Sequence, residues 1–448
     1  MLVKAVPFKT ILLQFLVLMF LPSESFLKEK IDFVEYDLDN GLHVILHQDN
    51  LNPLVSVDIW YHVGSKDEDS GRTGFAHLFE HMMFQGSKNV GKADHFKYIQ
   101  EAGGILNGST NQDRTNYFET VPSNQLELVL WLESDRMSTL NVTQENFDNQ
   151  REVVKEEKRQ NYDNVPYGSR FNNLFSRAYN NHPYHWIPIG SMNDLDDANV
   201  NYAQEFYKKY YAPNNAVLVI SGDINYEQTK LLVNKYFGGL IPSHFKRHSY
   251  PSNAFHTGEA LDTIYDRVQL PAIYVAYKIP EVTSKDIYPL ELLSLILSNG
   301  KSSRLYNKIV YEQKISKSVQ TWIWDLELGG LFMLSSTAMK NSNLDSVNKL
   351  MDDELLNVKK QAVSRNELEK AKNILVTQYV NRIQTTLGVS DFLAYYWTYF
   401  KDTGKINSEV DDYLKVTEKD IVDCANKYLT DDNRVVLYYL PKNDIENK

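Results

Sequence analysis

AQEFYKKYYAPNNAVLVISGD, at residues 203–223, is followed late in the chain by IVDCANKYLTDDNRVVLYYLP, at residues 421–441. Each stretch begins as an amphipathic helix, passes through a polar break that contains Asn or Asp, and ends in a strand rich in β-branched residues. The same order of elements at the end of each half of the chain indicates an internal repeat.

A second pair of segments supports the repeat at a similar offset. In the first half, a strand predicted at 55–64 leads to a helix predicted at 74–88. In the second half, a strand predicted at 271–280 leads to a helix predicted at 288–302. Two pairs of matching elements predict that one α/β unit has been duplicated.

We therefore predict an α+β fold made of two homologous α/β halves, each a mostly antiparallel sheet with helices packed on one face. The first half is expected to span 30–240 and the second 261–446. A polar, proline-interrupted segment at 241–260 is expected to link them.

The composition of the 448 residues excludes some classes of protein. Apolar residues make up 43% and charged residues 23%, which is typical of a globular chain with a large core. The formal net charge of −11 gives no basic surface for nucleic acid, so we expect no nucleic-acid partner. Cys424 is the only cysteine, so neither an intrachain disulfide nor a CxxC metal cluster can form.

The first 26 residues are typical of a signal peptide. Lys4 and Lys9 precede an apolar run at 10–21, and small polar residues follow it. The run is shorter than the roughly 20 residues that a membrane span needs. We therefore predict export, to the periplasm or as a secreted protein, and no stable membrane span. An uncleaved N-terminal anchor is the alternative.

The segment HLFEH, at residues 77–81, is the clearest functional signal. It lies in an apolar run without a helix breaker, and residues four apart on a helix stand on the same face. His77 and His81 can therefore bind one metal ion. Glu80 lies beside them and is placed to act as a general base toward the attacking water. The order H-x-x-E-H is the inverted zincin signature, and chance alone would produce it in a chain like this about once in fifty.

A third metal ligand is expected in the helix predicted at 143–163, which carries Glu152, Glu156 and Glu157. Glu157 shares the inward face of this helix with Val154, three residues earlier. Glu152 and Glu156 share another face that is rich in charge. We therefore predict Glu157 as the ligand, with Glu156 as the alternative because a helix phase is easily shifted by one residue.

With these residues in place, the chain resembles the pitrilysin/insulinase family of metallopeptidases, and in particular its half-length members similar to processing peptidases. The resemblance rests on HLFEHMMFQGSK and on the segments 102–122, 150–157 and 206–223. It implies a zinc endopeptidase with one Zn²⁺ per chain that cleaves peptides or small proteins. Family members have a Glu about 76 positions after the second His, and Glu157 stands at that distance.

The resemblance also suggests how a substrate is held. The segment 105–120 is expected to form a β-hairpin near the site, where an extended peptide adds to an edge strand. Asn107 matches a family position that contacts the substrate near the scissile bond. The alternative is that Asn107 only stabilises a turn.

The second half departs from the family pattern. Active members carry an Arg and a Tyr that stabilise the oxyanion, and the matching positions after SSRLY (302–306) are Val310 and Lys317. We therefore hypothesise a homodimer or heterodimer in which a homologous subunit supplies the Arg/Tyr pair. The second half also lacks a zinc motif, since the positions that correspond to the H-x-x-E-H residues are Glu291, Ser294 and Leu295.

Two other functions remain open at this point. One is a catalytically silent assembly subunit of the same fold, and the other is a zinc-dependent protein that binds or carries peptides without cleaving them. A buried carboxylate beside two imidazoles has no evident use in a purely structural subunit, which favours the peptidase.

Overall fold

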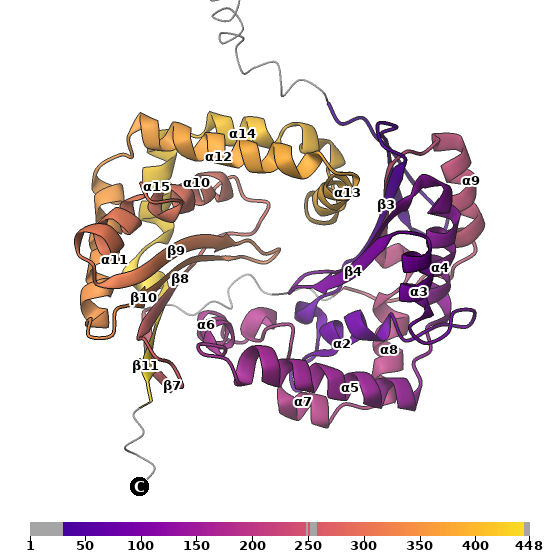
Figure 1. Cartoon of the computed structure of the whole chain (residues 1–448), viewed down its shortest axis with the longest axis horizontal. Helices are drawn as coiled ribbons and strands as arrows, with labels where there is room; N and C mark the ends of the chain where they lie inside the picture. Colours follow the sequence, from indigo (N-terminus) through magenta and orange to yellow (C-terminus); the bar gives the residue numbers. More distant parts are fainter. Residues whose placement is uncertain (1–29, 248–249, 251–257, 443–448) are drawn as a thin grey trace, which may run out of the picture.

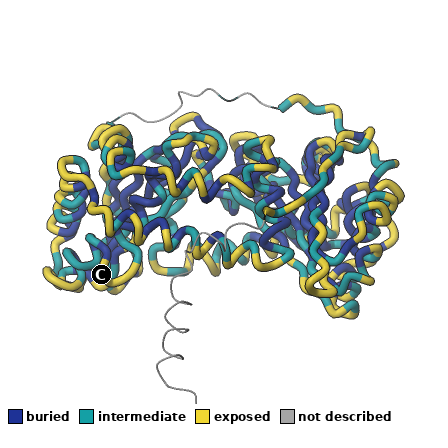
Figure 2. The backbone as a smooth tube through the Cα atoms, turned by 90° about the horizontal axis from the view of Figure 1, so that it is seen from above, coloured by how far each residue is buried: buried dark blue, intermediate teal, exposed yellow. Residues whose placement is uncertain are grey.

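The structure is a computed structural model, and it describes residues 30–247, 250 and 258–442. The predicted signal peptide at 1–26 lies outside the described residues, as do parts of the predicted linker at 241–260 and of the C-terminal end. Two lobes face each other across a central space (Figure 1). In each lobe the buried backbone lies inside and the exposed backbone forms the rim (Figure 2).

The first lobe is built on a six-stranded sheet in the order β1-β2-β6-β3-β5-β4. Its strands are β1 (Val34–Asp37), β2 (His43–Gln48), β3 (Leu54–Tyr61), β4 (Ile105–Thr110), β5 (Thr115–Pro122) and β6 (Ala216–Gly222). Its helices are α2 (Phe75–Met82), α3 (Asp94–Glu101), α4 (Leu126–Thr139), α5 (Gln144–Lys158), α6 (Arg170–Ala178), α7 (Met192–Asp196), α8 (Val200–Tyr210) and α9 (Tyr226–Phe237).

The second lobe is built on a five-stranded sheet in the order β7-β11-β8-β10-β9. Its strands are β7 (Ala260–Asp266), β8 (Ala272–Lys278), β9 (Ser316–Trp324), β10 (Leu331–Ala338) and β11 (Arg434–Pro441). Its helices are α10 (Ile287–Ser298), α11 (Leu344–Lys360), α12 (Arg365–Ile383), α13 (Thr386–Tyr395), α14 (Glu409–Lys415) and α15 (Glu418–Tyr428).

The two sheets repeat one topology. In the first sheet β2 runs parallel to β6, and in the second β7 runs parallel to β11. The other pairings among matching strands, from β6-β3-β5-β4 and from β11-β8-β10-β9, are antiparallel. Strand β1 is the additional strand of the first sheet. The predicted α+β fold with two homologous, mostly antiparallel halves is confirmed.

The lobes are joined by an exchange of helices. Helix α13 of the second lobe packs against β3 and β6 of the first sheet, and α6 of the first lobe packs against β8 and β11 of the second. Leu393 of α13 is fully buried against Trp60 and Val219. Full burial of one such side chain contributes about 1.5–3 kcal/mol, so the exchanged helices hold the lobes together as one unit.

The predicted helices mostly agree with the structure. The helix expected at 143–163 is α5, which continues as a π-helix, η5 (Arg159–Asp163). The helix expected at 74–88 is shorter, because α2 ends at Met82. Gly86 then adopts φ +94°, a left-handed conformation that favours glycine, and turns the chain toward an isolated bridge between Ser87 and Leu140.

Candidate metal centre

The buried carboxylate of Glu68 caps the N-terminus of helix α2. The side chain of Glu68 accepts hydrogen bonds from the N–H groups of Gly74 at 3.0 Å and of Ala76 at 2.8 Å. These amides belong to the first turn, which has no helical partners for them. The indole N–H of Trp186 donates to the same carboxylate at 3.0 Å. Glu68 therefore fixes where α2 starts and how it enters the site.

The two faces of α2 have different environments. Phe75, Leu78, Phe79 and Met82 are fully or almost fully buried against the sheet and its neighbouring helices. The other face carries the residues of the H-x-x-E-H motif, which are only partly buried. The apolar spacing thus turns both imidazoles and the Glu80 carboxylate away from the core, as the sequence pattern predicts for one face of a helix.

The structure brings His77, His81 and Glu157 together. Nε2 of His81 lies 3.3 Å from Oε2 of Glu157, and Nε2 of His77 lies 3.7 Å from the same oxygen. The two imidazole rings are 4.9 Å apart between centroids and nearly perpendicular, at 84°. One potential ligand atom from each residue lies within 4.8 Å of the others.

These distances suit one tetrahedral zinc ion. Ligand atoms at 2.0–2.1 Å from such an ion lie about 3.4 Å from each other, close to the separations observed. Burial lowers the pKa of His77, which keeps its imidazole neutral and able to donate a lone pair. The hydrogen bond from His81 lowers the pKa of Glu157, which keeps that carboxylate charged. The donor set of two imidazoles and one carboxylate is a known catalytic zinc set.

The neighbouring carboxylates of α5 point elsewhere. Glu156 is 54% exposed and forms an ion pair with Arg159 at 3.1 Å. Glu152 is 56% exposed and forms an ion pair with Lys155 at 3.3 Å. The structure therefore brings Glu157 to the imidazoles, and not Glu156, which was the alternative from the helix phase.

A cavity of about 320 Å³ adjoins the three residues, and His77 and Glu80 line it. Residues 109–112, where β4 ends, form another wall. Phe171 of α6 and Trp324 of β9 complete an aromatic side, so the second lobe contributes directly to this cavity. A lining that combines a carboxylate, an imidazole and aromatic rings suits an extended peptide with an apolar side chain.

Asn107 lies outside this cavity. It stands on β4, the edge strand of the first sheet, and its side chain is exposed. Its Oδ1 accepts a hydrogen bond from the N–H of Gly108 at 2.9 Å. The hairpin predicted at 105–120 is present as β4 and β5.

Arg304 lies close in sequence to the positions where the family pattern has its oxyanion-stabilising Arg and Tyr, but its guanidinium group is bound to carboxylates of the second lobe. Arg304 donates to Glu367 at 2.6 Å and 2.9 Å and to Glu354 at 3.3 Å. These contacts join the short helical stretch before the π-helix η8 (Tyr306–Glu312) to α12 and α11. Arg304 is therefore engaged within its own lobe.

The sequence pattern did not predict two residues that support α2. Glu68 caps the helix, and Tyr117 of β5 donates a hydrogen bond to the carbonyl oxygen of Phe79. Tyr117 is an aromatic residue within a strand, which favours a buried side chain but does not indicate its partner. Glu68 has no comparable signal, since its role depends on a loop conformation.

Comparison with known proteins identifies two matching family profiles. Residues 43–191 match "Insulinase (Peptidase family M16)", and residues 197–375 match "Peptidase M16 inactive domain". The chain is 29% identical over 413 residues to the zinc protease PqqE of Helicobacter pylori, covering 90% of this chain and 92% of that protein. It is 22% identical to a probable mitochondrial-processing peptidase subunit beta of Schizosaccharomyces pombe, covering 88% of each.

A solved structure gives the same result for the fold. The crystal structure of a protease from Helicobacter pylori superposes with a TM-score of 0.85 at 28% sequence identity. The match covers 92% of this chain and 100% of that one.

Proposed function

Since the chain belongs to the insulinase (M16) family of peptidases, and its relatives include proteins named as zinc proteases, we propose that it is a zinc-dependent endopeptidase. The observation that supports this most strongly is the Glu157 carboxylate within 3.3 Å and 3.7 Å of the two α2 imidazoles. We propose His77, His81 and Glu157 as ligands of one zinc ion per chain. Glu80, on the wall of the adjoining cavity, is the proposed general base.

The chemistry divides between the metal and the residues of the chain. A bound zinc ion supplies Lewis acidity that makes water a better nucleophile and polarises the scissile carbonyl. Glu80 accepts the proton that the attacking water loses and then delivers it to the leaving amine. His77 and His81 are held in place by the buried face of α2.

The substrate is proposed to bind as an added strand. β4 is an edge strand, and its last residues line the cavity. An extended peptide that pairs with β4 would therefore run past Glu80 and present its backbone to the metal centre. Asn107, exposed on this edge, is a proposed contact for the peptide.

The oxyanion requires hydrogen-bond donors that this chain does not place at the expected positions. Val310 and Lys317 stand where the family pattern has its Arg/Tyr pair, and Arg304 is held by Glu367 and Glu354. We propose that a homologous subunit supplies this pair in a homodimer or heterodimer. The similarity of this chain to a protein described as a peptidase subunit supports the proposal.

Export is part of the proposal and rests on the sequence of residues 1–26. Within the described part of the chain, no helix is long and apolar enough to span a membrane. We propose that the protein acts in the periplasm or outside the cell.

Metal analysis combined with a peptidase assay tests the proposal. The wild-type chain, alone and mixed with candidate homologous subunits, should contain about one zinc and lose cleavage of a quenched fluorescent peptide when a chelator is added. Glu157→Gln should lose both zinc and cleavage, whereas the matched control Glu156→Gln should keep both. Zinc binding without cleavage in every mixture would favour a peptide-binding protein, and the absence of both would favour a silent assembly subunit.

A further inference from the structure

The second lobe contains a counterpart of the metal centre. Helix α10 follows β8 as α2 follows β3, and α12 packs against α10 as α5 packs against α2. Glu291, Ser294 and Leu295 stand in α10 at the spacing that the H-x-x-E-H residues have in α2. The duplicated fold has thus kept the place of the site and changed its residues.

A cavity occupies this place, with a volume of about 540 Å³. Glu291, Ser294 and Leu295 line it, together with residues of β9 and α12 and the exchanged helix α13. The first lobe contributes Trp60 and Arg114, just as the second lobe contributes Trp324 to the metal cavity. The volume lies within the range of ligand pockets, about 300–1,000 Å³, and is larger than that of the metal cavity.

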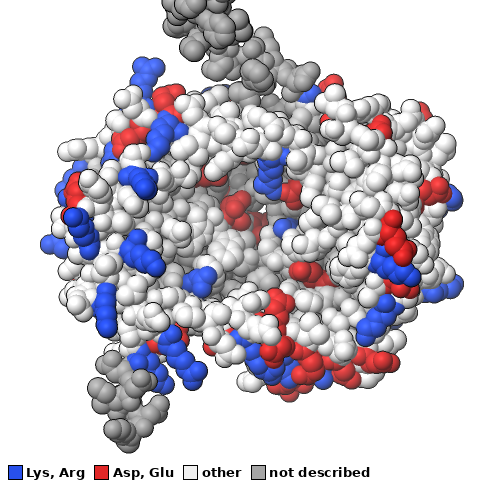
Figure 3. Space-filling view, viewed as in Figure 1, with Lys and Arg blue, Asp and Glu red and all other residues white. Residues whose placement is uncertain are grey.

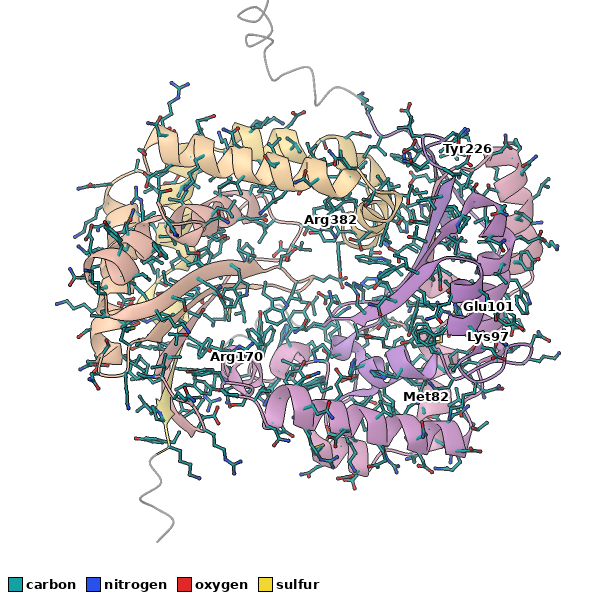
Figure 4. All side chains as sticks on the ribbon, viewed as in Figure 1. Met82, Lys97, Glu101, Arg170, Tyr226 and Arg382 are labelled. Atoms are coloured by element: carbon teal, nitrogen blue, oxygen red, sulfur yellow. The ribbon has the colours of Figure 1, made fainter. Side chains whose placement is uncertain are left out.

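The walls of this counterpart cavity are aromatic. Its rings include Trp322, Tyr288, Tyr379, Tyr395, Tyr399 and Tyr413. Cations already stack on rings in these walls, since Arg114 lies 4.7 Å from the Trp60 ring and Arg382 lies 4.3 Å from the Phe392 ring. Figure 4 labels Arg382, on α12 where that helix approaches α13. Aromatic faces gathered around a cavity attract a positive charge.

The lining of the counterpart cavity contains more carboxylates than cationic groups. The lining carries four carboxylates, on Glu291, Asp325, Asp391 and Glu409, and two guanidinium groups, on Arg114 and Arg382. Acidic side chains are visible on the wall of the hollow between the lobes (Figure 3).

Two of these carboxylates have cationic partners of their own. Arg382 forms an ion pair with Asp391, and Lys405 lies 3.1 Å from Glu409. Glu409 is nine-tenths buried, and the ammonium group of Lys405 lies 3.1 Å from its Oε2.

The other two carboxylates, Glu291 and Asp325, have only tyrosine partners. Tyr413 donates to Glu291, and Tyr395 donates to Asp325 at 3.2 Å. The cation that acts on Asp325 is Arg382, whose charge acts to lower the pKa of Asp325 but whose ion pair is with Asp391. Asp325 is accessible from the cavity, yet enough protein surrounds both groups that burial raises their pKa, to about 7 for Glu291. A buried carboxylate without an ion-pair contact is costly unless it takes up a proton or a cationic ligand neutralises it.

The carboxylates of this cavity are not gathered as the ligands of a metal ion. In the described part of the chain, two groups bring three potential ligand atoms within 4.8 Å of one another, and neither includes Glu291 or Asp325. Separated carboxylates and aromatic rings suit an organic cation, which has charge at one end and apolar surface along its stem.

We propose that the counterpart cavity binds a guanidinium or ammonium group on an apolar stem, with Glu291 and Asp325 as its charge partners and the surrounding tyrosines and Trp322 as its walls. Asn111 lines both this cavity and the metal cavity, so the two adjoin. A basic side chain of a peptide held in the metal cavity can therefore reach it. That source of the cation rests on the proposed peptidase function, and a free organic cation is the other source.

Binding of small probes tests the cation site without any peptidase activity. The probes are N-acetyl-arginine amide and its uncharged analogue N-acetyl-citrulline amide, titrated against the whole chain by calorimetry. We expect the arginine probe to bind at least tenfold more tightly than the citrulline probe. Glu291→Gln and Asp325→Asn should each bring the ratio close to one, whereas Glu312→Gln, an exposed carboxylate outside the cavity, should leave it unchanged.

Each result supports or overturns the proposal. Equal affinity of the wild-type chain for both probes, or the absence of binding, would overturn it. Thermal melts show whether each variant folds, and Asp325→Asn decides the matter if Glu291→Gln does not fold. A ratio that survives in both folded variants would also overturn the assignment.

Peptide substrates then identify the source of the cation. One arginine or one citrulline is placed at each position of a cleavable peptide in turn. A position where arginine raises kcat/KM at least tenfold, with a smaller ratio in Asp325→Asn, assigns the cation to the substrate. Probe binding without any such position assigns the cavity to a free organic cation. If no peptide is cleaved, the peptidase proposal fails, and the probe titration still tests the cavity.

Discussion

Tyr117 donates a hydrogen bond of 3.0 Å to the carbonyl oxygen of Phe79, the residue midway between the two imidazoles of α2. Both side chains are fully buried. The phenol therefore ties the motif helix to β5, the strand behind it. His77 and Glu80 line the cavity, and their orientation depends on such contacts on the buried side of α2.

Tyr117→Phe should weaken this support without creating a cavity. The Phe79 carbonyl keeps its helical bond from Met83, so we expect a loss of about 1 kcal/mol in the free energy of unfolding. Zinc affinity should fall with it, because the imidazoles become less well oriented. Urea unfolding of the metal-free chain and a competitive zinc titration measure the two effects.

Tyr61→Phe is the matched control for this substitution. Tyr61 is also fully buried, on the neighbouring strand β3, but its hydroxyl has no hydrogen-bond partner within the described residues. Its removal should leave stability unchanged or slightly higher. Equal losses in both variants would show that the Phe79 contact has no special role.

Glu80→Gln should separate metal binding from catalysis. Because Glu80 is not a proposed ligand, the variant should keep its zinc, and because the amide cannot accept the proton, turnover should fall by about 10²–10⁴-fold or more. Zinc content and peptide cleavage are measured on the same sample. Glu101→Gln, at the exposed end of α3 and labelled in Figure 4, is the control and should behave as wild type. Ordinary turnover in Glu80→Gln would place the general base elsewhere.

The sequence predicted the parts of this site that depend on local periodicity. Two His four apart on an apolar helix had to share a face, and the phase of α5 selected Glu157 over Glu156. The internal repeat predicted two matching sheets because the apolar periodicity of each strand and of the helix after it recurs in the second half.

Other features depend on tertiary partners that no local pattern records. The apolar composition of α13 indicates that the helix needs a covering surface, but not that the surface is the sheet of the other lobe. Glu68 caps α2 from a loop six residues before Gly74, and such a contact has no periodicity. The early end of α2 is followed by the left-handed turn at Gly86, which leads the chain into the bridge between Ser87 and Leu140. Leu140 lies far along the sequence, so no local pattern indicates this turn.

A buried ion cluster at the junction of the lobes should make stability depend on pH. Lys66, almost fully buried in the first lobe, lies 3.1 Å from Glu327 of the second, and His62 lies 2.7 Å from the same carboxylate. Burial acts to raise the pKa of Glu327, but the Lys66 charge and the His62 hydrogen bond outweigh it and hold the pKa well below its usual range.

The sign of the effect follows from this lowered pKa. Glu327 contributes its stability above its unfolded pKa of about 4.3 and loses it as the pH falls toward the folded value. We expect the unfolding free energy of Glu327→Gln to fall less steeply than that of wild type below about pH 4.3. Urea unfolding at several pH values measures the slopes, with Glu312→Gln as the exposed control. Equal slopes in Glu327→Gln and wild type would show that another group dominates acid unfolding.

Addition of the substrate to β4 predicts a periodic response to backbone methylation. A strand that joins a sheet edge directs alternate N–H groups toward its neighbour, so only every second amide of the peptide can bond to β4. N-methylation removes one donor at a time and leaves the side chains in place. Methylation at alternate positions on one side of the scissile bond should therefore lower kcat/KM at least tenfold, and methylation at the positions between should change it little.

The matched control for this scan is methylation of amides near the peptide ends, beyond the reach of the six residues of β4. These positions should show no effect. Substitution within β4 gives a second measurement, because Asn107→Ala removes the side chain that accepts a hydrogen bond from the N–H of Gly108. If Asn107 contacts the peptide, the substitution lowers kcat/KM and leaves the melting temperature unchanged. If it only supports the local backbone, the melting temperature falls instead. A methylation scan without alternation would contradict strand addition, because an added strand directs only every second amide toward the sheet edge.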